Sequence, residues 1–234
     1  QVALPSGRIC GAEALLRWRH PQRGLVSPLE FIPLAEELGL ILPIGEWVLD
    51  AVCAQIADWR ARFGWSPSVA VNVSALQLQQ HDFAQRVEAV LARHRIPAGL
   101  LELELTEHSL MQQHRRATDL LAVLKRQGVR LVLDDFGTGY SNLMTLSNMP
   151  FDMLKIDRSF VASMDDGTQG RALVGMITSL ASQLQLKVVA EGVETEAQQS
   201  MVAALGCDIV QGYLHSPPLP GANFEALALA RDAA

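Results

Sequence analysis

The chain has 234 residues, of which 49% are hydrophobic and 19% are charged, and its formal net charge is −6 at pH 7. This length and composition predict one soluble α/β domain with a large core, extending over residues 1–234. The acidic balance provides no basic face for duplex nucleic acid, and no apolar run is long enough to cross a bilayer, so we expect neither duplex binding nor membrane contact by this domain.

The chain begins abruptly inside an apolar segment, Gln1 to Leu4, without an initiator methionine or a signal-peptide pattern. We therefore expect a piece of a longer polypeptide in which the first strand is truncated. The three cysteines, Cys10, Cys53 and Cys207, lie far apart and form no C-x-x-C pair. Their number and spacing predict reduced thiols in a cytoplasmic protein.

Short apolar runs alternate with amphipathic segments along the whole chain. The first few residues are the remnant of one strand, and the other predicted strands are Ile9–Leu16, Val69–Val73, Leu101–Leu105, Val129–Leu133, Met153–Ile156, Lys187–Ala190 and Asp208–Val210. This alternation predicts parallel strands joined by crossover helices. Seven or eight such units favour a closed barrel over an open sheet, and the absence of a Gly-x-Gly-x-x-Gly turn after the first strand argues against dinucleotide binding.

Four of the amphipathic segments carry clear helix signals. The predicted helices span residues 28–38, 44–62, 173–184 and 196–205. Ser27 and Glu30 have the spacing of a capping box at the start of the first helix, and Thr195 and Gln198 have it at the start of the last. We expect the apolar stripes of these helices to pack on the sheet.

A polar side chain lies at or just beyond the carboxyl end of each of the seven predicted strands from Ile9–Leu16 to Asp208–Val210. These residues are Glu13, Asn72, Glu104, Asp134, Lys155, Glu191 and Gln211. In Leu101–Leu105 the leucines share one face and Glu104 takes the other, because strand side chains alternate. If the aliphatic side chains face the helices, the polar ones point toward the barrel axis and meet at its C-terminal mouth, where catalytic residues gather.

Carboxylates dominate this set, and Asp135 follows Asp134 directly. If all these groups share one site, six negative charges face two positive ones, which leaves an excess of four negative charges. The carboxylates are Glu13, Glu104, Asp134, Asp135, Glu191 and Glu194, and the cations are Lys155 and Arg17. Two divalent ions would balance that excess, and oxygen ligands suit Mg²⁺ or Mn²⁺ rather than Zn²⁺. The alternatives are a structural salt bridge for Lys155 and a solvated surface position for Arg17.

Seven motifs resemble those of the EAL domain family, the bacterial phosphodiesterases specific for cyclic di-GMP, and they occur in the family's order. They are Glu13-Ala14-Leu15-Leu16-Arg17-Trp18, Asn72-Val73-Ser74, Glu104-Leu105-Thr106-Glu107, Asp134 to Ser141, Leu154-Lys155-Ile156-Asp157, Ala190 to Glu194, and Gln211-Gly212-Tyr213. The resemblance implies a modified TIM (βα)8 barrel with an antiparallel first strand. It also implies a homodimer, and upstream sensory or GGDEF-type domains in the full-length protein.

The resemblance further implies the ligands of two Mg²⁺ or Mn²⁺ ions. Glu13, Asn72, Glu104 and Asp134 would hold one ion, and Asp134 would bridge to a second ion that Asp135 also binds. Two such ions assist water in breaking a phosphodiester bond. The implied reaction is hydrolysis of cyclic di-GMP to linear pGpG.

The remaining roles also follow from the resemblance. Lys155 would help to position the attacking water, Glu191 would be the general base, and Arg17, Leu15 and Asp157 would contact the substrate. Three further side chains would support these groups: Gln211 and Glu194 beside the ion ligands, and Glu107 as an anchor of the loop Phe136–Asn142, which in the family links metal binding to homodimerisation.

Two other functions compete with this interpretation. A receptor that binds cyclic di-GMP without cleaving it would typically lack some of the acidic ligands, and all of them are present here. A TIM-barrel enzyme acting on a metabolite phosphate or an enolate predicts a glycine-rich phosphate loop after the penultimate strands. The corresponding segment, Glu191-Gly192-Val193-Glu194, is acidic instead.

Overall fold

The computed structural model describes residues 1–111, 114–137, 149–165 and 167–232. Its strands are β1 (Val2–Ala3), β2 (Gly11–Ala14), β3 (Trp18–His20), β4 (Gly24–Val26), β5 (Ser68–Asn72), β6 (Leu101–Thr106), β7 (Arg130–Phe136), β8 (Met153–Ile156), β9 (Lys187–Glu191) and β10 (Ile209–Gln211). Its helices are α1 (Pro28–Glu37), α2 (Ile41–Phe63), α3 (Ala75–Leu78), α4 (Phe83–His94), α5 (Glu107–Met111), α6 (His114–Arg126), α8 (Arg158–Ser163), α9 (Thr168–Gln183), α10 (Glu196–Ala204) and α11 (Gly221–Asp232), with a 3-10 turn at Ala98–Leu100.

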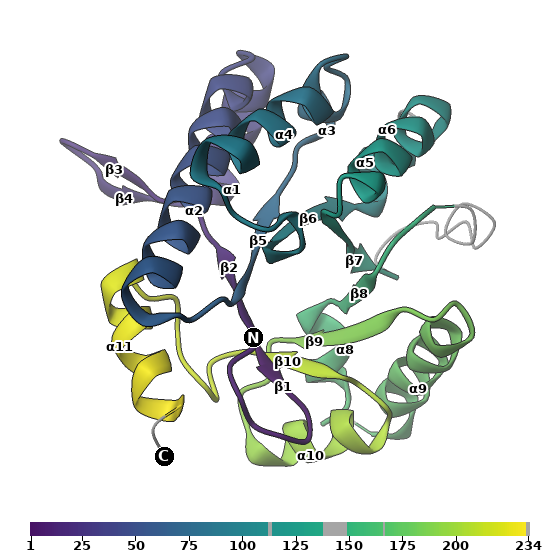
Figure 1. Cartoon of the computed structure of the whole chain (residues 1–234). Helices are drawn as coiled ribbons and strands as arrows, with labels where there is room; N and C mark the ends of the chain where they lie inside the picture. Colours follow the sequence, from purple (N-terminus) through teal and green to yellow (C-terminus); the bar gives the residue numbers. More distant parts are fainter. Residues whose placement is uncertain (112–113, 138–148, 166, 233–234) are drawn as a thin grey trace.

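Eight strands form a nearly closed barrel with the helices around it (Figure 1). The order is β1-β10-β9-β8-β7-β6-β5-β2, and neighbours from β2 to β10 pair in parallel. Strand β1 runs antiparallel to β10, and a bridge from Val2 to Ile9 links it to the segment that leads into β2. The predicted modified (βα)8 barrel with an antiparallel first strand is therefore confirmed.

The two faces of the barrel strands carry different side chains, as alternation requires. Leu131 and Leu133 of β7 belong to the large core between the sheet and the helices. Val132, between them, packs with Met153 and Val189 in a small cluster on the opposite face. Polar residues in register with this inner face, such as Asp134, therefore point toward the barrel axis.

Several predicted boundaries need correction. The first long strand is Gly11–Ala14 rather than Ile9–Leu16, and the second helix begins at Ile41 rather than Ile44. The predicted capping box at Ser27 is wrong, because the Ser27 side chain makes no capping hydrogen bond. Glu30 instead forms an ion pair with Arg23, at 2.6 Å, in the turn between β3 and β4.

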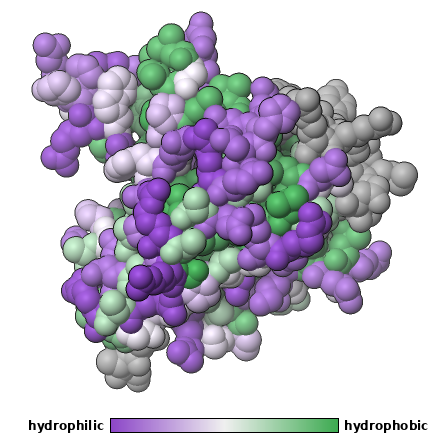
Figure 2. Space-filling model, turned by 45° about the horizontal axis from the view of Figure 1, so that its top comes forward, coloured by the Kyte–Doolittle hydropathy of each residue, from purple (hydrophilic) through white to green (hydrophobic). Residues whose placement is uncertain are grey.

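The second predicted capping box is confirmed, because the box of Thr195 and Gln198 is complete at the start of α10. All three cysteines are free thiols, and no helix within the described ranges has the length and hydropathy to span a membrane. Hydrophilic residues cover much of the face shown in Figure 2, with hydrophobic residues between them.

Candidate active site

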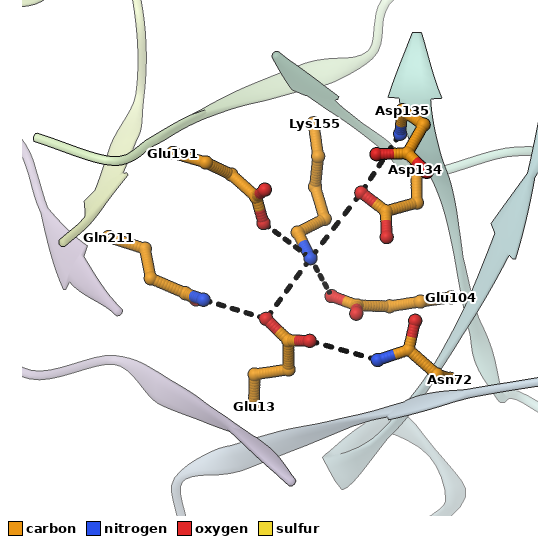
Figure 3. Close-up of polar contacts among 8 residues, drawn as sticks. All are labelled: Glu13, Asn72, Glu104, Asp134, Asp135, Lys155, Glu191 and Gln211. Carbon is orange, nitrogen blue, oxygen red and sulfur yellow. Dashed lines mark hydrogen bonds and ion pairs between the residues drawn. The ribbon is translucent and has the colours of Figure 1, made fainter. Parts of the chain in front are cut away.

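Side chains from seven strands converge inside the mouth of the barrel (Figure 3). They are the predicted set: Glu13 of β2, Asn72 of β5, Glu104 of β6, Asp134 of β7, Lys155 of β8, Glu191 of β9 and Gln211 of β10. Each stands in the last two or three residues of its strand, so the parallel arrangement brings residues almost 200 positions apart into contact. Gathering at this end is what a parallel barrel produces.

The ammonium group of Lys155 occupies the centre of the cluster. Its Nζ lies 2.6 Å from Glu191 Oε1, 2.9 Å from Glu104 Oε1, 3.2 Å from Glu13 Oε2 and 3.5 Å from Asp134 Oδ1. Only 1% of the lysine is exposed. Lys155 therefore forms the salt bridges that were one alternative for it, while its part in positioning water stays a prediction.

Two amides fix the orientation of Glu13. Asn72 Nδ2 donates to Glu13 Oε1 at 2.9 Å, and Gln211 Nε2 donates to Glu13 Oε2 at 2.7 Å. Burial opposes ionisation of Glu13, but the charge of Lys155 and these two donors outweigh it and lower its pKa. Glu13 is therefore a fixed anion between β5 and β10.

A β-bulge places both aspartates next to Lys155. Leu133 pairs with Leu154 and Phe136 pairs with Ile156, so Asp134 and Asp135 together oppose the single residue Lys155. Asp135 has a φ of 56°, a left-handed conformation that aspartate tolerates better than most residues, and its N–H donates to Asp134 Oδ1 at 2.9 Å. Bulges of this kind redirect side chains beside active sites.

The excess of negative charge changes how these groups ionise. Burial, with repulsion from Glu13 and Asp134, outweighs Lys155 and raises the pKa of Glu104 well above its usual range. Burial also raises the pKa of Glu191 to about 7 despite the adjacent ammonium. For Lys155, burial opposes the charge, but the carboxylates outweigh it and raise its pKa. The cluster therefore requires additional protons or cations to balance its charge.

A cavity of about 720 Å³ opens onto the cluster. Its lining includes Glu13, Asp134, Lys155 and Glu191, and also the predicted residues Leu15, Arg17, Glu194 and Gln211. Arg17 is exposed and donates to the carbonyl oxygen of Leu16. These positions leave room for a ligand of nucleotide size between the acidic cluster and the surface.

Two predicted residues, Asp157 and Glu107, lie at the edges of this arrangement. Asp157 follows β8 and caps helix α8, accepting a hydrogen bond from the N–H of Ser159 at 2.9 Å. The pKa of Asp135 is raised most by burial, next by the charge of Asp134, and also by the charge of Asp157. Glu107 begins α5 directly after β6. The loop that Glu107 is predicted to anchor extends into residues 138–142, which lie outside the described ranges.

Two lining residues received no role in the sequence analysis. Arg158 and Tyr213 both line the cavity. Arg158 directly follows the motif residue Asp157, and Tyr213 is the last residue of the Gln211-Gly212-Tyr213 motif, so their position just past a strand end was the available signal. Arg158 adds a positive charge to the cavity wall, where an anionic substrate would benefit from it.

The donor set fits a hard divalent cation. Both side-chain oxygens of Glu104 are buried without a hydrogen bond, although Oε1 is ion-paired with Lys155. Unsatisfied carboxylate oxygens at a negative site suit Mg²⁺ or Mn²⁺. No three acidic, histidine or cysteine side chains in the described parts of the chain already surround one point as metal ligands. Lys155 stands between the carboxylates, so an ion would have to share or take its place.

Comparison with known families gives a direct result. The sequence profile described as "EAL domain" matches residues 1–218. The chain belongs to the EAL domain family. The prediction that this one domain continues to residue 234 stays untested, because the match ends before α11.

Two curated members of the family are similar over nearly the whole chain. The bifunctional diguanylate cyclase/cyclic di-GMP phosphodiesterase MucR of Pseudomonas aeruginosa is 44% identical over 220 residues, which is 94% of this chain and 32% of MucR. The cyclic di-GMP phosphodiesterase PA2567 of the same species is 40% identical over 219 residues, 94% of this chain and 37% of that protein. The EAL chain thus spans about a third of the length of these relatives.

Solved EAL structures share the fold. The structure described as "PaMucR Phosphodiesterase, c-di-GMP complex" has a TM-score of 0.91 at 44% identity and covers 95% of this chain and 90% of that one. The EAL enzyme Bd1971 in its cAMP and cyclic-di-GMP bound form has a TM-score of 0.91 at 35% identity, covering 97% of this chain and 62% of that one.

Proposed function

We propose that this EAL domain hydrolyses cyclic di-GMP to linear pGpG. The observation that supports the proposal most strongly is the acidic cluster, in which four carboxylates lie within 3.5 Å of the buried Lys155 ammonium. The similarity to proteins described as cyclic di-GMP phosphodiesterases supports the choice of substrate. The cavity that opens onto the cluster has space for such a ligand.

The cluster also supports a two-metal site. Glu13, Asn72, Glu104 and Asp134 would hold one Mg²⁺ or Mn²⁺, and Asp134 and Asp135 a second. When bound, such ions lower the pKa of water and neutralise charge on the reacting phosphate. The bulge at the two aspartates suits this assignment, because it lets adjacent residues of one strand serve neighbouring ions.

Side chains of the domain would carry out proton transfer, water positioning and substrate binding. Glu191, whose pKa of about 7 suits a general base near neutral pH, would take the proton of the attacking water. Lys155 would orient that water, and Arg17 and Leu15, which line the cavity, would contact the substrate. The substrate contact of Asp157, which is not among the lining residues, stays a prediction from the family resemblance. The water oxygen would bond to phosphorus as the bond from phosphorus to the ribose 3′ oxygen breaks, and that oxygen would take a proton from solvent while Glu191 returns the proton it accepted to solvent.

Other predictions about the protein stay predictions. Gln211 donates a hydrogen bond to Glu13. Glu194 is proposed to support the ion ligands, and Glu107 is proposed to anchor the loop Phe136–Asn142. The homodimer, the upstream sensory or GGDEF-type domains and the cytoplasmic location remain proposals that follow from family membership. MucR, a relative with two named activities, is an example of an EAL region in a longer polypeptide.

The test is product analysis with the purified domain and cyclic di-GMP in Mg²⁺, Mn²⁺ or chelator. We expect metal-dependent pGpG formation that disappears in Glu13→Ala and Glu191→Ala and persists in Glu37→Gln, a control at the exposed end of α1. Binding that survives Glu191→Ala would support its role as base. Tight binding without turnover by the unmutated domain would contradict the proposal and favour a receptor.

A further inference from the structure

A single buried side chain holds the backbone that follows the proposed base. Gln198 is 6% exposed, and its Oε1 accepts hydrogen bonds from the N–H groups of Glu194, at 2.8 Å, and Thr195, at 3.2 Å. A capping box accounts for only the second of these bonds, together with the bond from Gln198 N–H to Thr195 Oγ1 at 3.1 Å. The additional bond from the Glu194 N–H connects Gln198 to the loop between β9 and α10.

The other end of the same amide reaches a different unit of the barrel. Gln198 Nε2 donates to Asp165 Oδ2 at 2.7 Å. Asp165 follows helix α8, which begins directly after the strand that carries Lys155. Gln198 therefore ties the loop after Glu191 to the unit after Lys155, and these two side chains form the shortest ion pair of the cluster, at 2.6 Å.

The loop has little room to relax by itself. Gly192 has a φ of 68°, and a Cβ there would lie 2.5 Å from Arg158 Cβ. A Cβ at Gly212 would lie 2.1 Å from the carbonyl oxygen of Val193. The loop is thus packed between α8 and the end of β10, so a shift of its backbone is transmitted to the strand end rather than absorbed.

We propose that Gln198, held by Asp165, is a positioning residue that sets the place of Glu191 relative to Lys155. The position needs a neutral amide, since one oxygen must accept from two N–H groups while the nitrogen donates to a carboxylate. A glutamate has acceptor oxygens but no donor, and its repulsion from Asp165 would push it away from the two N–H groups as well. This inference rests on the proposed function for its kinetic effect.

Reversing the polarity of the Gln198–Asp165 bond tests the inference. In Gln198→Glu two carboxylates meet, and we expect kcat to fall about tenfold with KM changed by less than about twofold, as for other supporting partners. Asp165→Asn alone keeps an acceptor and should have a small effect. In the double variant the asparagine amide donates to the new glutamate, and kcat should return to within about threefold of wild type. Ser200→Glu adds the same charge at an exposed position of α10 as a control.

The outcomes separate positioning from simple stability. The inference is overturned if kcat in Gln198→Glu stays within about twofold of wild type, or if the double variant regains its melting temperature but not its kcat. Hydrogen exchange of the Glu194 and Thr195 amides provides a readout that needs no turnover. It should accelerate in Gln198→Glu and slow again in the double variant, and unchanged exchange would also overturn the inference. If the wild type does not hydrolyse cyclic di-GMP, that result refutes the proposed function and not the role of Gln198, which hydrogen exchange still tests.

Discussion

Replacing Lys155 by methionine should make the metal-free protein depend on added divalent ions for its stability. The substitution keeps a long apolar stem in a fully buried position and removes only the ammonium. Four carboxylates then lose their common partner. Glu104 is affected most, because it is 1% exposed and neither of its oxygens accepts a hydrogen bond.

The size of the effect follows from that burial. Removing one partner of a buried ion pair destabilises a protein by about 3–5 kcal/mol. At about 2–4 °C per kcal/mol for a chain of this length, the melting temperature in chelator should fall by roughly 6–20 °C. The loss should be smaller at pH 5 than at pH 8, because protonation relieves the unpaired carboxylates. Saturating Mg²⁺ or Mn²⁺ should reduce the difference in melting temperature between the variant and the wild type, because the bound ion supplies positive charge.

Thermal unfolding of both proteins, with and without chelator, measures these differences. Lys125→Met is the matched control, because Lys125 forms its ion pair with Asp152 while 40% exposed, and such pairs contribute about 1 kcal/mol or less. The reasoning is refuted if Lys155→Met melts within about 3 °C of wild type in chelator at pH 8. It is equally refuted if divalent ions stabilise the variant no more than they stabilise the wild type.

Three further predictions concern the base, the caps and the glycines. Glu191 has a pKa of about 7 in the folded protein without metal, against 4.5 in the unfolded chain, so the folded state keeps its proton to higher pH. Its contribution to the free energy of unfolding in chelator should therefore fall by about 3 kcal/mol as the pH rises from 4.5 to 7. Urea unfolding at several pH values measures this slope, and Glu191→Gln should remove it. Thr195→Ala should cost about 1 kcal/mol and Ser27→Ala almost nothing, because only the threonine makes a capping bond; equal losses would contradict this. Gly212→Ala should destabilise by about 1–3 kcal/mol or more through its clash with a backbone oxygen, whereas Gly175→Ala, which meets only ordinary contacts inside α9, should be neutral or stabilising in the same assay.

Strand alternation made the barrel and its polar mouth predictable. Glu104 and Asp134 each follow a leucine that faces the helices, so a period of two was enough to send both carboxylates inward. The order of strands in the sheet then brought Glu13 and Gln211 together across the closure of the barrel. These features depend on local patterns that hold along every strand.

The features that sequence missed depend on contacts between distant segments. The bulge at Asp134 and Asp135 is a change of register against β8, and nothing local in an Asp-Asp pair requires it. The false capping box at Ser27 had the right spacing, but Glu30 pairs with Arg23 in a neighbouring hairpin instead. Tertiary contacts decide both cases, and a single sequence does not display them.

Locating Mn²⁺ by its anomalous scattering in crystals of the protein tests the central claim most directly. The account predicts two ions at the barrel mouth, one touching Glu13, Glu104 and Asp134 and a second touching Asp134 and Asp135, with Lys155 Nζ moved away from the centre of the carboxylates. Saturating Mn²⁺ that binds elsewhere, or that leaves Lys155 in its four-carboxylate contacts, would contradict the claim that this cluster is a metal site.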